Sequence, residues 1–283
     1  MTLTGAAKVA GVIGWPIVHS ISPTLHGYWL RENKVDGALV PLAVARENFA
    51  RVVRALQLSG FRGANVTLPH KEAAFALADQ SDAAAKTARA ANLLIFHDSH
   101  IEARNTDMVG LRESIRERLG DLKGRNVVLL GAGGAARGAI LALDELGAAN
   151  VHILNRHPEK AASLVRELGP LVACALEADD LRDWNKAAGT AHLVINATSA
   201  GMKGHSPLAV DLGALCSTAS VFDIVYNPLE THLLKDAKTR GHVIIDGLGM
   251  LMHQAVPSFE AFFGVRPKVT DGLRAFLEKS LHA

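Results

Sequence analysis

The chain has 283 residues, of which 49% are hydrophobic and 20% are charged, and this is enough apolar material for two ordinary domains. Its formal net charge of +2 comes with no dense run of Lys and Arg, which argues against nucleic-acid binding and favours small-molecule partners. No stretch approaches the roughly 18 apolar residues of a membrane span, and no signal peptide is expected. Cys174 and Cys216 fit neither a disulfide framework nor a metal motif, so we expect a reducing cytoplasm and no metal.

Short apolar runs alternate with helical patterns in the first part of the chain. The expected elements are a strand over 9–13, a helix over 23–34, a strand over 38–44, a helix over 47–58, a strand over 63–66 and a helix over 69–78. This β-α-β rhythm predicts a mostly parallel sheet. Two short strands at 93–96 and 101–103 follow, and then a helix over 108–119.

A polar, glycine-containing joint at 121–125 indicates a crossover to a second series. The strands expected there are 126–130, 151–154, 171–174, 193–196, 221–224 and 243–245. A helix ending near Leu146 follows the first of them, and two helices, over 248–261 and 270–281, end the chain. The predicted fold class is therefore α/β with two domains.

A glycine-rich loop follows the strand at 126–130 and opens a helix. Its residues are Gly131, Ala132, Gly133, Gly134, Ala135 and Ala136. The first glycine permits a tight turn, the second lets the backbone approach a pyrophosphate, and Ala136 lets helix and strand pack closely. The phosphates would then lie over the N-terminus of the helix, so the loop predicts a Rossmann-type dinucleotide site.

The next strand of this series ends in Asn155-Arg156-His157, with Lys160 a turn later. A site specific for NAD usually has Asp or Glu at this place, to bind the ribose diol. A guanidinium and an ammonium instead suit a 2′-phosphate, which favours NADP over NAD. The alternative is an ordinary basic helix start on the surface.

Lys71 is the candidate for proton transfer. Pro69 suits the first position of a helix, so Lys71 is expected in the first turn, where a cation is least favoured. A carboxylate such as Asp107, in the segment Asn105-Thr106-Asp107, would oppose that effect, and the pair would suit proton exchange. Taken alone, a lysine in a first helical turn is more often a solvated surface residue.

Six ordered segments spanning most of the chain together resemble the shikimate dehydrogenase family. They are GVIGWPIVHSISP (11–23), NVTLPHK (65–71), NTD (105–107), the glycine-rich loop, NATSAGM (196–202) and DGLGMLMHQA (246–255). The resemblance implies that residues 1–107 and 248–283 form a substrate-binding domain. It also implies that residues 108–247 bind NADP, and that the C-terminal helices return to the first domain.

The resemblance also implies roles for individual residues. Lys71 would be the catalytic acid and base, working with Asp107 on the proton while hydride passes between 3-dehydroshikimate or shikimate and NADP. Ser20, Ser22 and Tyr226 would bind the substrate carboxylate, and Asn65, Thr67, Asn92 and Gln254, with Asp107, its ring hydroxyls. The cofactor residues would be Gly131, Ala132, Gly133, Gly134, Ala135, Asn155, Arg156, Lys160, Thr198, Ser199, Ile224, Gly247 and Met250.

Some of these residues have simpler explanations. Ser22 directly precedes Pro23 and could be a helix N-cap, whereas Ser20 has no such role. Asn92 could cap a turn, and Tyr226 could be ordinary packing. Gln254 lies in an apolar helical pattern and needs a partner there.

The chain also departs from the family pattern at four places. It has Leu93 where the family usually has Thr, Arg104 where a small or acidic residue is common, Met108 in place of Gly, and His157 in place of Thr. These changes leave the substrate less certain than the reaction. In the family, selectivity for shikimate goes with serine at the position of Ser22, and quinate use with threonine.

Two other functions stay open at this point. One is a paralogous dehydrogenase acting on quinate or an aminoshikimate-type acid. The other is a non-catalytic sensor that binds a cyclic acid, against which Lys71 and Asp107 argue. The protein is expected to be a monomer or a homodimer.

Overall fold

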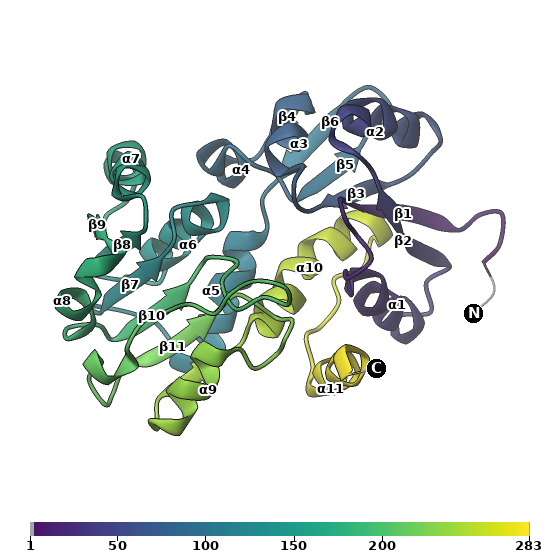
Figure 1. Ribbon diagram of the computed structural model, residues 1–283. Coiled ribbons are helices and arrows are strands. Elements are labelled where there is room, and N and C mark those ends of the chain that lie inside the picture. The colour runs from purple at the N-terminus through teal and green to yellow at the C-terminus, as the bar shows by residue number, and fades with distance from the viewer. Residues whose placement is uncertain (1–2, 283) are drawn as a thin grey trace. The chain divides into compact units, whose positions relative to one another are not determined.

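The computed structural model describes residues 3–282, which form two compact units (Figure 1). Unit 1 comprises the residues up to Thr106 together with those from Gln254 onward, and unit 2 comprises Asp107–His253. The joint at 121–125, expected as the crossover, lies inside unit 2, so that expectation is wrong. The second crossing lies between His253 and Gln254, within a helix, whereas the resemblance placed it before residue 248.

The sheet of unit 1 has the strand order β2-β1-β3-β5-β6-β4. Its strands are β1 (Lys8–Gly14), β2 (Gly37–Ala43), β3 (Gly63–Val66), β4 (Gln80–Ser81), β5 (Leu93–Phe96) and β6 (Ile101–Arg104). The first three are mutually parallel where they pair, and β5 runs antiparallel to both β3 and β6. The pair β4·β6 is again parallel, so three of the five strand pairs within the described residues of this unit are parallel and the prediction of a mostly parallel sheet is confirmed.

Helices cover both faces of this sheet. They are α1 (Ser22–Glu32), α2 (Phe49–Leu58), α3 (Lys71–Leu77), α4 (Ala83–Ala88), α11 (Asp271–His282) and the later part of α10 (Gly247–Phe263). Phe49 and Val53 of α2 pack on Ile13 and Val66 of the sheet. On α10, Phe262 and Phe263 lie against Gly63 and Gly37, where a side chain would collide with the rings.

Unit 2 has a six-stranded parallel sheet with the order β12-β11-β10-β7-β8-β9, which is the dinucleotide-binding order. Its strands are β7 (Asn126–Leu130), β8 (Asn150–Asn155), β9 (Ala175–Asp180), β10 (Leu193–Asn196), β11 (Ser220–Asp223) and β12 (Val243–Ile245). Its helices, besides the start of α10, are α5 (Asp107–Leu119), α6 (Gly134–Glu145), α7 (Pro158–Leu168), α8 (Trp184–Ala188) and α9 (His232–Thr239).

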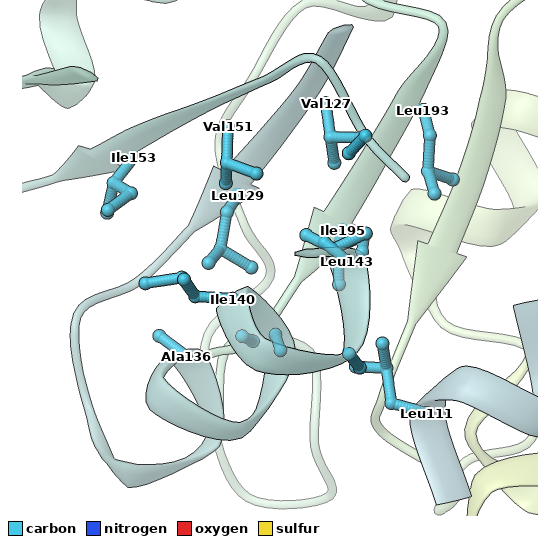
Figure 2. Close-up of a cluster of buried hydrophobic side chains, with 14 of the residues drawn as sticks. Leu111, Val127, Leu129, Ala136, Ile140, Leu143, Val151, Ile153, Leu193 and Ile195 are labelled. Atoms are coloured by element: carbon cyan, nitrogen blue, oxygen red, sulfur yellow. The ribbon is translucent and has the colours of Figure 1, made fainter. Parts of the chain in front are cut away.

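Alternate residues of the central strand β7 face opposite layers of helices. Val127 and Leu129 belong to a buried cluster with α5, α6 and α7, part of which Figure 2 shows. Val128 and Leu130 belong to a second cluster, with α8 and α9. Burial on both faces explains why this strand reads as a continuous apolar run. The carboxyl ends of β7, β8, β10 and β11 meet at one edge of the sheet, which is where the sequence motifs of this unit lie.

One strand was misplaced by the sequence pattern. The segment expected as a strand at 171–174 begins with a short 3-10 turn, Gly169–Leu171, and the strand is β9. β9 is an edge strand with three acidic residues among its six and none fully buried, so no continuous apolar run marks it. Among the described residues, no helix is both long and apolar enough to cross a membrane.

His26 of α1 is fully buried among aromatic rings of unit 1, with Trp29 and Phe259 among them. Neither ring nitrogen has a hydrogen-bond partner among the described residues, and burial lowers the pKa of His26 to about 3. Below pH 6.5 this imidazole therefore binds a proton in the unfolded chain but stays neutral in the folded chain. The free energy of unfolding thus decreases as the pH falls below about 6.5.

We expect the loss attributable to His26 to be about 2 kcal/mol between pH 7 and pH 5. The His26→Leu variant should lack it, and should be at least as stable as wild type at pH 7, because it removes an unsatisfied buried group of similar size. Urea unfolding of both proteins across this pH range measures the difference. Parallel pH profiles for the two proteins would contradict the assignment.

Candidate active site

The glycine-rich loop of unit 2 connects β7 to α6. Gly131 has φ +110°, and a Cβ there would lie 2.8 Å from Cγ2 of Thr198, so only glycine permits this approach to the loop after β10. At Gly133 and Gly134 a Cβ would meet nothing within 4 Å. Helix α6 starts at this open space, and Gly133 provides no side-chain cap. Backbone N–H groups at an uncapped helix start suit a pyrophosphate.

A cavity of about 380 Å³ lies beside this loop. It is lined by Leu130, Gly131, Leu154, Asn155, Arg156, Leu181, Thr198, Ser199, Ala200 and the segment His205–Ala209. The structure thus brings together residues that follow β7, β8 and β10, as predicted for a dinucleotide site. Lys160, also expected here, is exposed on α7 and is not part of the lining.

Sequence reasoning missed the part of the cavity formed by Leu181 and by His205–Ala209. The latter segment belongs to a loop whose turns are closed by backbone bonds, from Gly201 N–H to the Ser206 carbonyl and from His205 N–H to that of Met202. It has no periodicity, and its only sequence signal is its position just after NATSAGM.

Ile224 and Gly247, expected as cofactor residues, are neighbours in unit 2. A Cβ at Gly247 would clash with the backbone of Ile224 and Val225, so glycine is required at the start of α10. Met250 and Ile224 both pack against the buried cluster of Figure 2. These residues form part of unit 2 next to the carboxyl end of β11.

A polar cluster in unit 1 joins three distant segments. Asn92 Nδ2 donates to Thr106 Oγ1 (3.0 Å) and to Gln254 Oε1 (3.2 Å), while its Oδ1 accepts from the Thr106 N–H (2.8 Å). Thr106 Oγ1 also donates to the Gln254 carbonyl (2.8 Å). Asn92 therefore links three segments and is not simply a turn cap. The Gln254 side chain has the hydrogen-bond partner that is expected for a polar residue in an apolar helix.

Asn65 of β3 is buried, and its Oδ1 has no hydrogen-bond partner among the described residues. Its neighbour across the sheet is Leu93, one residue after Asn92. A buried amide oxygen without a donor costs about 1–3 kcal/mol. A ligand hydroxyl would satisfy it, so this side of unit 1 fits a polyhydroxy ligand.

Lys71 is the first residue of α3, so it lies in the first turn as predicted. The helix does not begin at Pro69, because residues 67–70 form a turn in which the His70 N–H donates to the Thr67 carbonyl (3.0 Å). His70 is buried, its ring stacks on Phe49, and its Nε2 lies 2.7 Å from the Val44 carbonyl. His70 thus fixes the backbone next to Lys71, a role that the sequence did not reveal.

The two serines differ from expectation. Ser22 is inside α1, whose N-cap position is Ile21, and the side chain of Ile21 makes no capping hydrogen bond. It is Ser20 whose hydroxyl accepts from the Ser22 N–H (3.3 Å). The N-cap explanation for Ser22 is therefore wrong, and the backbone-binding role falls to Ser20.

Asp107 and Tyr226 belong to unit 2. Asp107 starts α5 and lies next to Gly138 of α6, where a Cβ would be 3.9 Å from the Asp107 Cβ. Tyr226 follows β11 by three residues, and burial raises the pKa of its phenol.

Within residues 3–282, no group of three or more His, Cys, Asp or Glu residues could hold a metal ion.

Comparisons with known proteins agree with this geometry. The family model described as the shikimate dehydrogenase substrate binding domain matches residues 12–94, and that described as shikimate / quinate 5-dehydrogenase matches residues 113–204. The protein of Paramagnetospirillum magneticum named shikimate dehydrogenase (NADP(+)) is 47% identical over 281 residues, which cover 97% of this chain and 99% of that one. The chain belongs to the shikimate dehydrogenase family.

Solved structures support the fold of this family over the whole chain. Shikimate 5-dehydrogenase from Thermus thermophilus, in complex with NADP(H) and shikimate, is 30% identical with a TM-score of 0.84, covering 97% of this chain and 98% of that one. Quinate dehydrogenase from Corynebacterium glutamicum, in complex with NAD, is 28% identical with a TM-score of 0.88, covering 98% and 99%. The α/β fold with a Rossmann-type unit is confirmed.

The departures from the shikimate dehydrogenase pattern fall in different surroundings. Arg104 donates to Glu102 (2.6 Å) and lines a separate cavity with Glu260 and Arg266, to which none of the expected substrate residues contributes. Leu93 is fully buried in β5. His157 is exposed before α7, with Nδ1 3.6 Å from Glu159 Oε1.

Proposed function

We propose that this protein catalyses the reversible NADP-dependent reduction of 3-dehydroshikimate to shikimate. The observation that carries the proposal is the polar cluster of unit 1, with the unpartnered Asn65 Oδ1 beside it. Several buried or half-buried groups that donate and accept suit a small ring with one carboxylate and several hydroxyls. The match of residues 12–94 to a substrate-binding domain supports the same placement.

We assign substrate binding to unit 1, with a contribution from Tyr226. Ser20, Ser22 and Tyr226 bind the carboxylate in this proposal. Asn65, Thr67, Asn92 and Gln254 bind the ring hydroxyls. Because Asn92 and Gln254 also bind each other and Thr106, their side chains are oriented before the ligand arrives, which lowers the entropy lost on binding.

We assign NADP to unit 2. The residues of the glycine-rich loop from Gly131 to Ala135 accommodate the pyrophosphate, and Arg156, Lys160 and Asn155 accommodate the adenosine 2′-phosphate. Thr198, Ser199, Ile224, Gly247 and Met250 complete the cofactor site. The open space at Gly133 and Gly134 and the cavity containing Arg156 support the assignment.

When bound, NADPH supplies the hydride and NADP⁺ accepts it. In the direction of reduction, Lys71 donates a proton to the ketone oxygen, which becomes the hydroxyl of shikimate. In the direction of oxidation, Lys71 removes the proton from that hydroxyl. Asp107 orients Lys71 and the hydroxyl, and its negative charge stabilises the protonated lysine.

Absorbance of NADPH distinguishes this proposal from its alternatives. We expect shikimate to be preferred over quinate by at least tenfold in kcat/KM, because Ser22 matches the shikimate-selective members of the family and quinate needs room for an added hydroxyl. Ser22→Ala should raise KM for shikimate more than it lowers kcat, with Ser59→Ala of the same unit as a control. The assay on both acids measures the ratio.

Each contrary result supports a particular alternative. Equal or better use of quinate would identify a quinate-type enzyme, a possibility favoured by the likeness to quinate dehydrogenase. Turnover of neither acid would support an aminoshikimate-type substrate or a non-catalytic sensor.

Two further properties belong to the proposal. The cysteines Cys174 and Cys216 are both free thiols, which suits a reducing compartment, and we place the protein in the cytoplasm. We propose that it works as a monomer or a homodimer, which sedimentation would decide.

A further inference from the structure

Asp223, the last residue of β11, is a fully buried carboxylate that no step of the proposed reaction uses. Three uncharged groups donate to it. Thr231 Oγ1 donates to Oδ2 (2.7 Å), and Asn196 Nδ2 and the Val225 N–H donate to Oδ1 (2.9 Å and 3.1 Å). Burial raises the pKa of Asp223 to about 6, against the effect of the three donors. A costly buried acid held only by neutral donors calls for an explanation.

The Asn196 amide connects Asp223 to the cofactor cavity. Asn196 is the last residue of β10, and its Oδ1 accepts from the N–H (3.1 Å) and the hydroxyl (2.7 Å) of Thr198. Its Nδ2 also donates to the Ala200 carbonyl (3.1 Å). The amide can shape this turn in one orientation only, with its nitrogen toward Asp223. Thr198 in turn lines the cavity and contacts the position of Gly131.

The Val225 N–H connects Asp223 to the segment after β11. The Val225 N–H bonded to Asp223 lies between Ile224 and Tyr226, which we assign to cofactor and substrate. The same backbone is pressed against Gly247. The remaining donor is the Thr231 hydroxyl. Its oxygen accepts from the Leu234 N–H (3.3 Å) and so caps α9, while its hydrogen is donated to Asp223.

We infer that Asp223 is a positioning residue for the dinucleotide site. Asp223 fixes the Asn196 amide, and through it Thr198, and it also fixes the segment Ile224–Tyr226. The inference rests on the proposed function of unit 2 as the NADP-binding unit. Aspartate suits the position because a carboxylate only accepts, and three donors converge on it. Asparagine is nearly isosteric but would present an N–H group to at least one of these donors.

The test measures dinucleotide binding directly, by NADPH fluorescence on the full-length protein, so that it does not depend on turnover of shikimate. Asp223→Asn should raise the Kd for NADPH by about 5- to 20-fold, the effect of one or two lost hydrogen bonds. Asp211→Asn, an exposed aspartate of the same unit that accepts from the Gly213 N–H, is the matched control and should leave Kd unchanged.

A double variant separates positioning from general structural damage. Asp223→Asn combined with Thr198→Val alters two points of the same proposed route through the Asn196 amide. We expect the two losses of NADPH affinity to be less than additive, because Asp223 acts partly through Thr198. Affinity in Asp223→Asn within twofold of wild type would overturn the inference. So would losses from Asp223→Asn and Thr198→Val that add fully in the double variant.

A third variant keeps the inference testable if Asp223→Asn does not fold. Thr198→Val removes the hydroxyl that donates to Asn196, and it leaves Asp223 and the bond from the Thr198 N–H to Asn196 intact. It should weaken NADPH binding by a smaller factor than Asp223→Asn, and wild-type affinity in this variant would overturn the proposed route. If wild-type protein binds NADPH but turns over no acid, the proposed reaction fails while the role of Asp223 stands.

Discussion

Lys71→Ala is expected to lower kcat by about 10²–10⁴ while KM for shikimate stays within a few fold. The reason is that the variant loses proton transfer to the reacting oxygen and keeps the polar groups that bind the ring. Lys71 is half-buried at the start of α3, and the truncation leaves the turn held by His70 intact. Steady-state kinetics in both directions, monitored by NADPH absorbance, measures the effect.

The matched control is Lys86→Ala, which truncates an exposed lysine of α4 in the same unit. It should retain wild-type kinetics. Asp107→Asn should also lower kcat, because it removes the charge that orients the lysine. If Lys71→Ala turned over shikimate within threefold of wild type, Lys71 would not be the acid and base.

Arg156→Ala is expected to lower the preference for NADP over NAD by about 10- to 100-fold in kcat/KM. Removing one charge-assisted phosphate contact costs about 1.5–3 kcal/mol, and NAD lacks the phosphate that would feel the loss. Arg156 lines the cavity beside the glycine-rich loop, so it is placed for this contact. Kinetics with both cofactors at saturating shikimate gives the ratio.

Arg166→Ala, an exposed arginine in the last turn of α7, serves as the control for the removal of a positive charge. His157→Ala should have a smaller effect than Arg156→Ala, because its imidazole is exposed and is not part of the cavity lining. A wild-type protein that already prefers NAD would contradict the role given to this segment.

The sequence predicted well the elements that are buried on both faces. β7 and β10 are continuous apolar runs, and their bounds follow from that burial. Partly exposed elements carry no such signal. The edge strand β9 is acidic, β4 has only two residues, and the short helix α4 is missing from the periodicity. The positions of β4 and β9 depend on tertiary pairing, whereas α4 has a local signal, the N-cap Asp82, that hydrophobic periodicity does not include.

Site residues divide in a similar way. Motifs that follow a strand, such as Gly131 and Arg156, could be placed because a parallel sheet gathers its carboxyl ends. The bonding of Asn92 to Gln254 spans 162 positions and could not be derived from spacing. The role of His70 depends on the Val44 carbonyl, 26 positions away, and that of Asp223 on the Asn196 amide, 27 positions away, which is why spacing did not reveal them.

The cofactor site consists of a part shaped by backbone and a part formed by side chains, and the two differ in how readily they tolerate substitution. Around the glycine-rich loop the shape comes from backbone, and Gly131 tolerates no side chain because it lies against Thr198. The feature to which we assign the distinction between NADP and NAD is instead the exposed side chain of Arg156 after β8, which belongs to neither buried cluster of this unit. Under the proposed role of Arg156, a substitution at this one position would change the preference between NADP and NAD without altering the core. The capacity to bind a dinucleotide at all would survive such a change.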